Sequence, residues 1–264
     1  MITEYLKIPC ELAIFALREQ KYKQACTYAA TQFLYSGKAK LSDRPSRRIA
    51  NEIDVSESTV YRHFKWLLSR NWMGKDENNG WLFFRGLDSI HGIENWQFGR
   101  AAIMHKKDLQ NIKAFLAGAV MASLVQTGKG QRTEQVKGCS EQAVGPISLS
   151  LLANTLNVST KTAYRLRKLA DKCNYIANRP NLVQITNWTP NDLTELRKQD
   201  VHRLPVELLG YADKRITSID RIRYKKNKLF LQEPNLVNPF IQLKSRKGLS
   251  KYVPPNPSTN VSQQ

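Results

Sequence analysis

Two groups of aromatic and basic side chains recur in this sequence at a constant spacing. Tyr61 and Arg62 return as Tyr164 and Arg165, an offset of 103 positions (164 − 61). Ammonium and guanidinium groups donate hydrogen bonds to phosphate oxygens, and a guanidinium can also donate two bonds to one guanine edge. The chain therefore carries the chemistry of a polyanion contact in two places.

The repeat extends well beyond these four residues. The repeat lies within residues 49–68 (IANEIDVSESTVYRHFKWLL) and residues 151–170 (LLANTLNVSTKTAYRLRKLA), with the same offset of 103 between matching positions. The identical pairs are Ala50/Ala153, Asn51/Asn154, Val55/Val158, Ser56/Ser159, Thr59/Thr162, Tyr61/Tyr164, Arg62/Arg165, Lys65/Lys168 and, just beyond, Asn71/Asn174. A repeated pattern of this kind predicts one structural unit present twice.

The first copy predicts two short helices joined by a tight turn. Pro45 suits the start of a helix over residues 46–53, and Ser56 suits the N-cap of a second helix. Apolar residues then recur at i, i+4, i+7 and i+8, as Val60, Phe64, Leu67 and Leu68. This is the amphipathic stripe of a helix with one buried face, so the pattern predicts a helix-turn-helix.

A β-hairpin is expected directly after this second helix. Asn79-Gly80 is a turn signal because both residues tolerate positive φ, and Trp72-Met73 and residues 81–84 suit the flanking strands. Lys75 and Arg85 would point from this hairpin toward phosphates. Before the helix-turn-helix, residues 11–35 predict one long helix that stops at Gly37.

The second copy predicts the same order of parts. An apolar helix covers residues 108–126 and stops at Gly128, Ser148 caps a helix through Leu156, and a further helix covers residues 160–173. Residues 174–186 (NYIANRPNLVQIT) are expected to form strand, Asn-Arg-Pro-Asn turn and strand, with Arg179 at the tip.

This arrangement resembles the winged helix-turn-helix superfamily, over about residues 8–90 and 100–188. The resemblance implies duplex DNA binding, with the second helix of each pair in a major groove and the hairpins, called wings, on the backbone or minor groove. The expected fold class is mainly α with small β-hairpin wings (α+β). The candidate DNA-contacting residues are Ser58, Thr59, Tyr61, Arg62, Lys65, Lys75, Arg85, Thr160, Lys161, Thr162, Tyr164, Arg165, Arg167, Lys168 and Arg179.

Other interpretations of these residues stay open. Tyr61 and Tyr164 also suit packing against the first helix of each unit, and Arg62 and Arg165 also suit simple solvation. Glu57 either accepts from a cytosine amino group or favours the helix N-terminus. Winged helices can also serve as protein-binding modules.

The C-terminal part becomes strongly basic. A helix is expected from Thr189 (TPNDLTELRKQ), and an apolar segment covers residues 204–212. Cations then cluster in a region that is expected to contact DNA phosphates or, alternatively, to act as a solubilising tail. The DNA-contacting candidates in this region are Arg221, Arg223, Lys225 and Lys226. The expected organisation is a first winged helix at 1–92, a second at 93–188, a helical and basic extension at 189–232, and a disordered tail at 233–264.

Composition favours a nucleic-acid partner. The 264 residues carry 41 Lys and Arg against 22 Asp and Glu, a net charge of +19. A charge of that size concerns the partner rather than the fold. No apolar run approaches a bilayer-spanning length, and no signal peptide is recognised, so we expect a cytoplasmic protein associated with nucleoid, plasmid or phage DNA, without a membrane partner.

Metal, cofactor and catalytic motifs are not recognised. The cysteines (Cys10, Cys26, Cys139, Cys173) and histidines (His63, His91, His105, His202) have no zinc-ligand spacing. A phosphate-binding glycine loop, a G-x-S-x-G or H-E-x-x-H motif, and a paired carboxylate site are also missing. We therefore expect no cofactor and no enzymatic activity.

The predicted function is sequence-specific binding of double-stranded DNA from a mobile element, through two unlike half-sites. The two-unit architecture is similar to plasmid and phage replication initiators. A transcriptional regulator or repressor, or an accessory factor that positions a recombination, conjugation or segregation complex, remains an alternative. The replication or transcription machinery would be the protein partner, and the oligomeric state is open.

Overall fold

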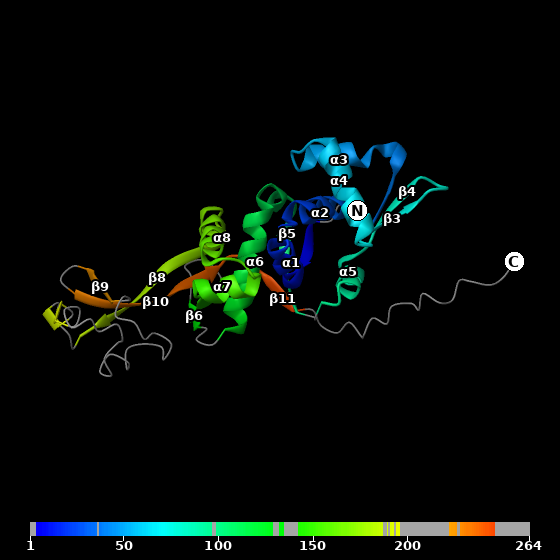
Figure 1. The fold of residues 1–264 in the computed structure, drawn as a ribbon. Coiled ribbons are helices and arrows are strands. Elements are labelled where there is room, and N and C mark those ends of the chain that lie inside the picture. The colour runs from blue at the N-terminus through cyan, green and yellow to red at the C-terminus, as the bar shows by residue number, and fades with distance from the viewer. Residues whose placement is uncertain are drawn as a thin grey trace.

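The computed structural model describes residues 4–35, 37–96, 99–128, 132–134, 142–186, 189, 191–192, 194–195, 222–225 and 228–245. They form helices and small antiparallel sheets, so the predicted α+β class is confirmed at that level (Figure 1). Within the described part, no helix combines the length and apolar character that crossing a bilayer requires.

The first copy contains β1 (Tyr5–Pro9), α1 (Cys10–Arg18), α2 (Tyr22–Tyr35), β2 (Lys38–Lys40), a 3-10 turn η1 (Leu41–Asp43), α3 (Pro45–Glu52), α4 (Glu57–Ser69), β3 (Met73–Asp76) and β4 (Trp81–Phe84). The single helix predicted over residues 11–35 is wrong, because the chain breaks into α1 and α2. Gln20 adopts φ 56°, and the Lys21 N–H donates to Ala16 O at 2.8 Å. A left-handed residue after the last turn is a common way for a helix to end.

The predicted first hairpin is present. Strands β3 and β4 pair antiparallel from Met73–Phe84 to Asp76–Trp81, and β2 pairs with the other edge of β4. Gly80 adopts φ 63°, which a glycine reaches without steric cost. Asp76 Oδ1 accepts from the Asn78 N–H at 3.0 Å and so fixes the turn from inside.

The second copy follows the short helix α5 (Leu87–Ile93). It contains β5 (Arg100–His105), a 3-10 turn η2 (Lys106–Asn111), α6 (Ile112–Thr127), β6 (Arg132–Glu134), β7 (Gln142–Pro146), α7 (Leu149–Leu156), α8 (Thr160–Lys172) and β8 (Ile176–Ile185). The strands β9 (Ile222–Lys225), β10 (Lys228–Pro239) and β11 (Leu243–Ser245) follow much later in the chain.

The predicted second hairpin is wrong. Residues 176–185 continue as one strand, β8, and its partner is β10 rather than the following residues. Pro180 has no N–H to donate to a ladder, and the β8–β10 register shifts opposite it, between Glu233 and Leu236. Arg179 therefore lies within a strand, not at a turn.

Despite this difference, the sheets of the two copies have the same strand order. The first sheet is β2-β4-β3, and the second contains β7-β10-β8 with β6 at its edge. The strand before the helix pair and the strand after it are thus separated by one central strand in each copy. In the second copy, that central strand is supplied from more than forty residues further along the chain.

The predicted disordered tail is wrong for residues 233–245. Strand β10 buries Leu229, Leu231 and Val237, and β11 pairs with β5. The expected boundaries at 188 and 232 consequently cut through one sheet. Residues 191–192 and 194–195 are helical, and the Thr189 N–H donates to Asp192 Oδ2 at 2.7 Å. The segments 196–221 and 246–264, and so Arg221, lie outside the described residues, as does Lys226.

One hydrophobic core joins the two copies. Strands β1 and β5 pair antiparallel from Tyr5–His105 to Pro9–Ala101. Helix α1 packs on α6, where the Cys10 thiol donates to Ala119 O at 3.9 Å. A single cluster of buried apolar side chains includes residues of both copies, from Leu6 to Ile241 in the sequence. The separation between the copies is therefore set by a β-ladder and a helix–helix contact rather than by a linker.

Candidate nucleic-acid interface

The turn between the two helices has the same geometry in both copies. Asp54 adopts φ 52° and Asn157 adopts φ 51°, and Asp and Asn are the non-glycine residues that best tolerate this conformation. The next residue, Val55 or Val158, donates its N–H to the carbonyl five positions earlier at 3.0 Å. The two turns therefore share the same left-handed residue and the same closing hydrogen bond.

The caps of the second helices also match. Ser56 Oγ accepts from the Thr59 N–H at 3.3 Å, and Ser159 Oγ accepts from the Thr162 N–H at 3.2 Å. The hydroxyl groups within each pair are also in contact, at 2.9 and 3.0 Å. Each cap satisfies a backbone donor that the first helical turn leaves free. Both helices then run for 13 residues.

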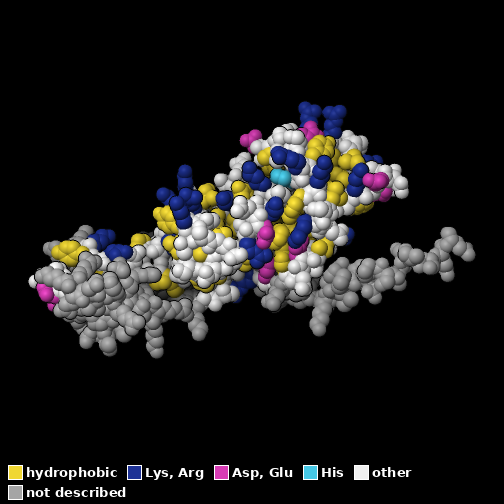
Figure 2. Space-filling view, in the orientation of Figure 1, with side chains coloured by type: hydrophobic (Ala, Val, Ile, Leu, Met, Phe, Trp, Pro, Cys, Tyr) yellow, Lys and Arg dark blue, Asp and Glu magenta, His cyan; other side chains and the backbone are white. Residues whose placement is uncertain are grey.

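The outer faces of α4 and α8 expose the repeated residues. Tyr61 is 52% exposed and Tyr164 is 50% exposed, so about half of each side chain is accessible to a partner. The exposed basic side chains on these faces are Arg62, Lys65, Lys161, Arg165 and Lys168. Ser58 and Thr160 are exposed, and Thr59 and Thr162 are half-buried. Figure 2 shows Lys and Arg side chains gathered over α3–α4 and over α8 along the upper edge of the view.

Arg167 does not belong to this surface, and its predicted DNA contact is wrong. Its side chain is 7% exposed and donates to Ile147 O at 3.4 Å. Burial holds the pKa of the guanidinium below its usual range. The equivalent residue in the first copy is Phe64, which is also buried (167 − 64 = 103). This position therefore lies on the buried face of both helices.

Glu57 is occupied by a contact within the protein. Ser46 Oγ donates to Glu57 Oε1 at 2.6 Å, which ties the start of α3 to the first turn of α4. A carboxylate in the first turn also suits the positive end of the helix dipole. The geometry supports a structural role for Glu57.

The first hairpin adds cations beside α4. Lys75 is exposed, with Glu77 Oε1 3.5 Å from its Nζ. Arg85 donates from Nε and Nη2 to Asn71 Oδ1 at 3.2 and 2.8 Å, which holds it at the base of the hairpin.

Four further exposed cations of the first copy were missed by the sequence interpretation. Lys38 and Lys40 lie over the Trp81 ring, at 5.2 and 5.3 Å from its centroid. Arg47 and Arg48 are exposed on α3. The signal was present in the alternation Lys38-Ala39-Lys40, since a strand with a buried middle residue turns both neighbours outward.

The β8–β9–β10 ribbon carries the remaining candidates, away from α4 (Figure 1). Arg179, Arg223 and Lys225 are all exposed, and Arg223 Nε donates to Gln232 Oε1 at 2.9 Å. The ribbon is thus a second basic region that belongs to the second copy alone.

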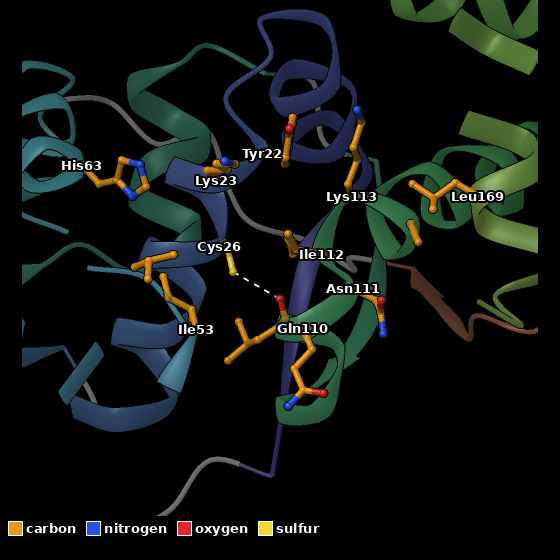
Figure 3. A pocket seen from close by; sticks show the side chains of 13 residues that line it. Tyr22, Lys23, Cys26, Ile53, His63, Gln110, Asn111, Ile112, Lys113 and Leu169 are labelled. Atoms are coloured by element: carbon orange, nitrogen blue, oxygen red, sulfur yellow. Dashed lines mark hydrogen bonds between the residues drawn. The ribbon is translucent and has the colours of Figure 1, made fainter. Parts of the chain in front are cut away.

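A cavity of about 320 Å³ lies between the two copies (Figure 3). Its walls come from α2, α4 and the α3–α4 turn on one side and from η2, α6 and α8 on the other. The His63 ring lines it, and Nδ1 is 2.6 Å from Thr27 Oγ1. Burial, followed by the charges of Arg62 and Lys23, lowers the pKa of His63. The Cys26 thiol donates to Leu109 O at 3.4 Å, and burial raises its pKa to about 12.

The described residues contain no group of three His, Cys, Asp or Glu side chains that could hold a metal ion. Comparisons with protein-family models, curated proteins and solved structures found no match to this chain.

Proposed function

We propose that this chain is a sequence-specific, double-stranded DNA-binding protein built from two winged helix-turn-helix units. In this proposal α4 and α8 enter major grooves, β3–β4 is the wing of the first unit, and β8–β10 is that of the second. One observation carries the proposal: α4 and α8 expose Tyr-Arg-x-x-Lys at the same helical positions while their opposite faces are buried.

Each exposed residue type has a role that fits its chemistry. Arg62 and Arg165 suit base edges, because a guanidinium can bind guanine O6 and N7 together. Lys65 and Lys168, three residues further along each helix, suit phosphates. Lys75, on the β3–β4 hairpin, extends the phosphate contact beside α4. The net charge of +19 supplies the general attraction to a polyanion.

The two units would read different sequences. The first turn of α4 begins Glu57-Ser58, and that of α8 begins Thr160-Lys161, so the residues nearest the bases differ. Because the β1–β5 ladder joins the copies, the distance between the two reading helices is fixed. We expect two unlike half-sites with centres about 34 Å apart, or a multiple of that distance.

Selection from a random duplex library at about 150 mM salt tests this function. The expected product is an asymmetric consensus with two separate blocks of conserved bases. Insertion of five base pairs between the blocks should abolish tight binding, since it turns one half-site to the opposite face of the duplex. A library that stays random after repeated selection, or a perfect palindrome bound by one chain, would contradict the proposal.

Within this function, the role we propose is replication initiation on a mobile element, because two reading units in one chain suit an asymmetric origin repeat. Regulation of transcription is the second candidate, and the cavity between the units favours it, since an occupant would touch both reading helices. An accessory DNA-positioning factor is the third. Mapping the bound sites in source DNA separates them: repeats beside an AT-rich tract support initiation, and sites over promoters support regulation.

A further inference from the structure

The cavity between the two copies contacts the inner sides of both exposed helices. His63 lines it from α4 and directly follows Arg62, while Leu169 lines it from α8 and directly follows Lys168. In Figure 3, His63, Lys23 and Ile53 lie on one side of the view and Lys113, Asn111 and Leu169 on the other. Any occupant would therefore touch both helices from behind their outer faces.

The lining has the chemistry of a site for an amphipathic anion. Ile53, Val55 and Leu169 offer partly exposed apolar surface. Lys23 and Lys113 provide two cations at the edge, and Lys113 Nζ lies 4.8 Å from the centroid of the Tyr22 ring. Within the described part of the chain, the lining includes no Asp or Glu. These cations thus have no carboxylate partner inside the cavity wall.

We propose that this cavity binds a small aromatic molecule carrying one carboxylate or sulfonate group. Its volume of about 320 Å³ falls in the range of small-molecule sites, which are mostly apolar with a few polar groups that orient the ligand. The aromatic body packs against Ile53, Val55 and Leu169, and the anionic group lies between Lys23 and Lys113. Desolvation of the ring drives binding, and the two ammonium groups select the anion.

A matched pair of fluorescent probes tests the site on the full chain. The anion 8-anilinonaphthalene-1-sulfonate and its uncharged analogue N-phenyl-1-naphthylamine share the same rings. We expect saturable, one-to-one binding of the sulfonate with a dissociation constant on the order of 10–100 μM, and binding of the analogue weaker by about tenfold. Non-saturable fluorescence, or equal affinity for the two probes, would overturn the proposal.

Three variants locate the bound probe. Leu169→Trp fills the cavity and should abolish binding, and Lys23→Ala combined with Lys113→Ala should remove the preference for the sulfonate. The double variant changes only side chains at the cavity edge, so it should fold even if the tryptophan does not; circular dichroism checks both. Lys7→Ala combined with Lys228→Ala removes two exposed lysines outside the cavity, on β1 and β10, so it is the charge-matched control and should bind like the parent. Unchanged binding in both cavity variants would place the probe elsewhere and contradict the assignment.

An effect of the bound probe on DNA affinity rests on the proposed function, whereas binding of the probe to the cavity does not. An occupant that touches both α4 and α8 adds contacts to each of them and shifts the separation that the unliganded protein holds, so saturating sulfonate should change the affinity for the selected duplex at least about threefold. If the DNA affinity is unchanged when the cavity is saturated with probe, the cavity is a binding site that does not regulate DNA binding. If the protein selects no DNA sequence, the probe titrations still decide whether the cavity is a site.

Discussion

Asn71 and Asn174 occupy equivalent positions in the two copies and share one backbone conformation, with φ 58° at both. In each case the N–H of the next residue, Trp72 or Tyr175, donates to the carbonyl five positions earlier at 2.9 Å. This left-handed ending closes the last turn of α4 and of α8 and sets the direction of the strand that follows. The repeat is therefore conformational as well as chemical.

Substitution at Asn174 measures how much this helix ending contributes. Asn174→Gly should leave the free energy of unfolding nearly unchanged, because glycine adopts positive φ freely. Asn174→Val should lower it by about 1–2 kcal/mol, the cost of forcing a β-branched residue into the left-handed region. Urea denaturation followed by circular dichroism gives both values. A valine variant as stable as the glycine variant would show that the ending is not under this constraint.

The serine cap of α8 gives a second stability prediction. Ser159→Ala leaves the Thr162 N–H without its acceptor and should cost about 1 kcal/mol. Ser159→Asp keeps an acceptor and should retain the parent's stability. Thermal melts compare the three proteins under identical conditions. Equal melting temperatures for the alanine and aspartate variants would rule out the cap.

Arg167 is buried and its neighbour Lys168 is exposed, so substitutions at these two positions should have different effects on DNA binding. Arg167→Met should keep both stability and DNA affinity, because an apolar side chain of similar length replaces a buried guanidinium at the position where α4 has Phe64. Lys168→Ala should weaken binding to all duplexes and reduce the salt slope by about 0.9, the loss of one phosphate contact. Fluorescence anisotropy titrations at several salt concentrations measure both effects. A reduced slope for the methionine variant would return Arg167 to the interface.

His63 predicts a pH dependence with a definite sign. Its pKa is lowered in the folded protein, so the unfolded chain binds the proton more readily. Its contribution to stability is therefore present above the unfolded pKa of about 6.5 and is lost as pH falls toward the folded value. The second copy has Leu166 at the equivalent position, which makes His63→Leu the matched variant. Urea unfolding at pH 7.5 and 5.5 should show a smaller loss for the leucine variant; an equal loss would assign the effect to other groups.

Helix caps and turns were predicted correctly from the sequence, because each depends on only a few neighbouring residues. Ser56, Ser159, Asn79 and Gly80 have short-range roles in caps and turns, and the structure has a cap or turn at each. The partner of β8 could not be found in this way, because β10 lies far along the chain and directly follows a basic run, so its apolar residues Leu229, Leu231 and Val237 were not recognised as a strand. Arg167 was misplaced for a different reason: its residue type suggested a surface contact, although alignment with Phe64 indicated a buried position.

The proposed function requires each unit to read its own half-site, and paired selections measure this for α4 and α8 separately. The same random duplex library is offered to the parent, to Arg62→Ala and to Arg165→Ala, and the bound DNA is sequenced. Each variant should lose sequence preference in one block only, a different block for each, with affinity lowered by about 1–3 kcal/mol if the arginine binds guanine bidentately. Loss of preference in both blocks from one substitution, or unchanged preference in both variants, would contradict the account.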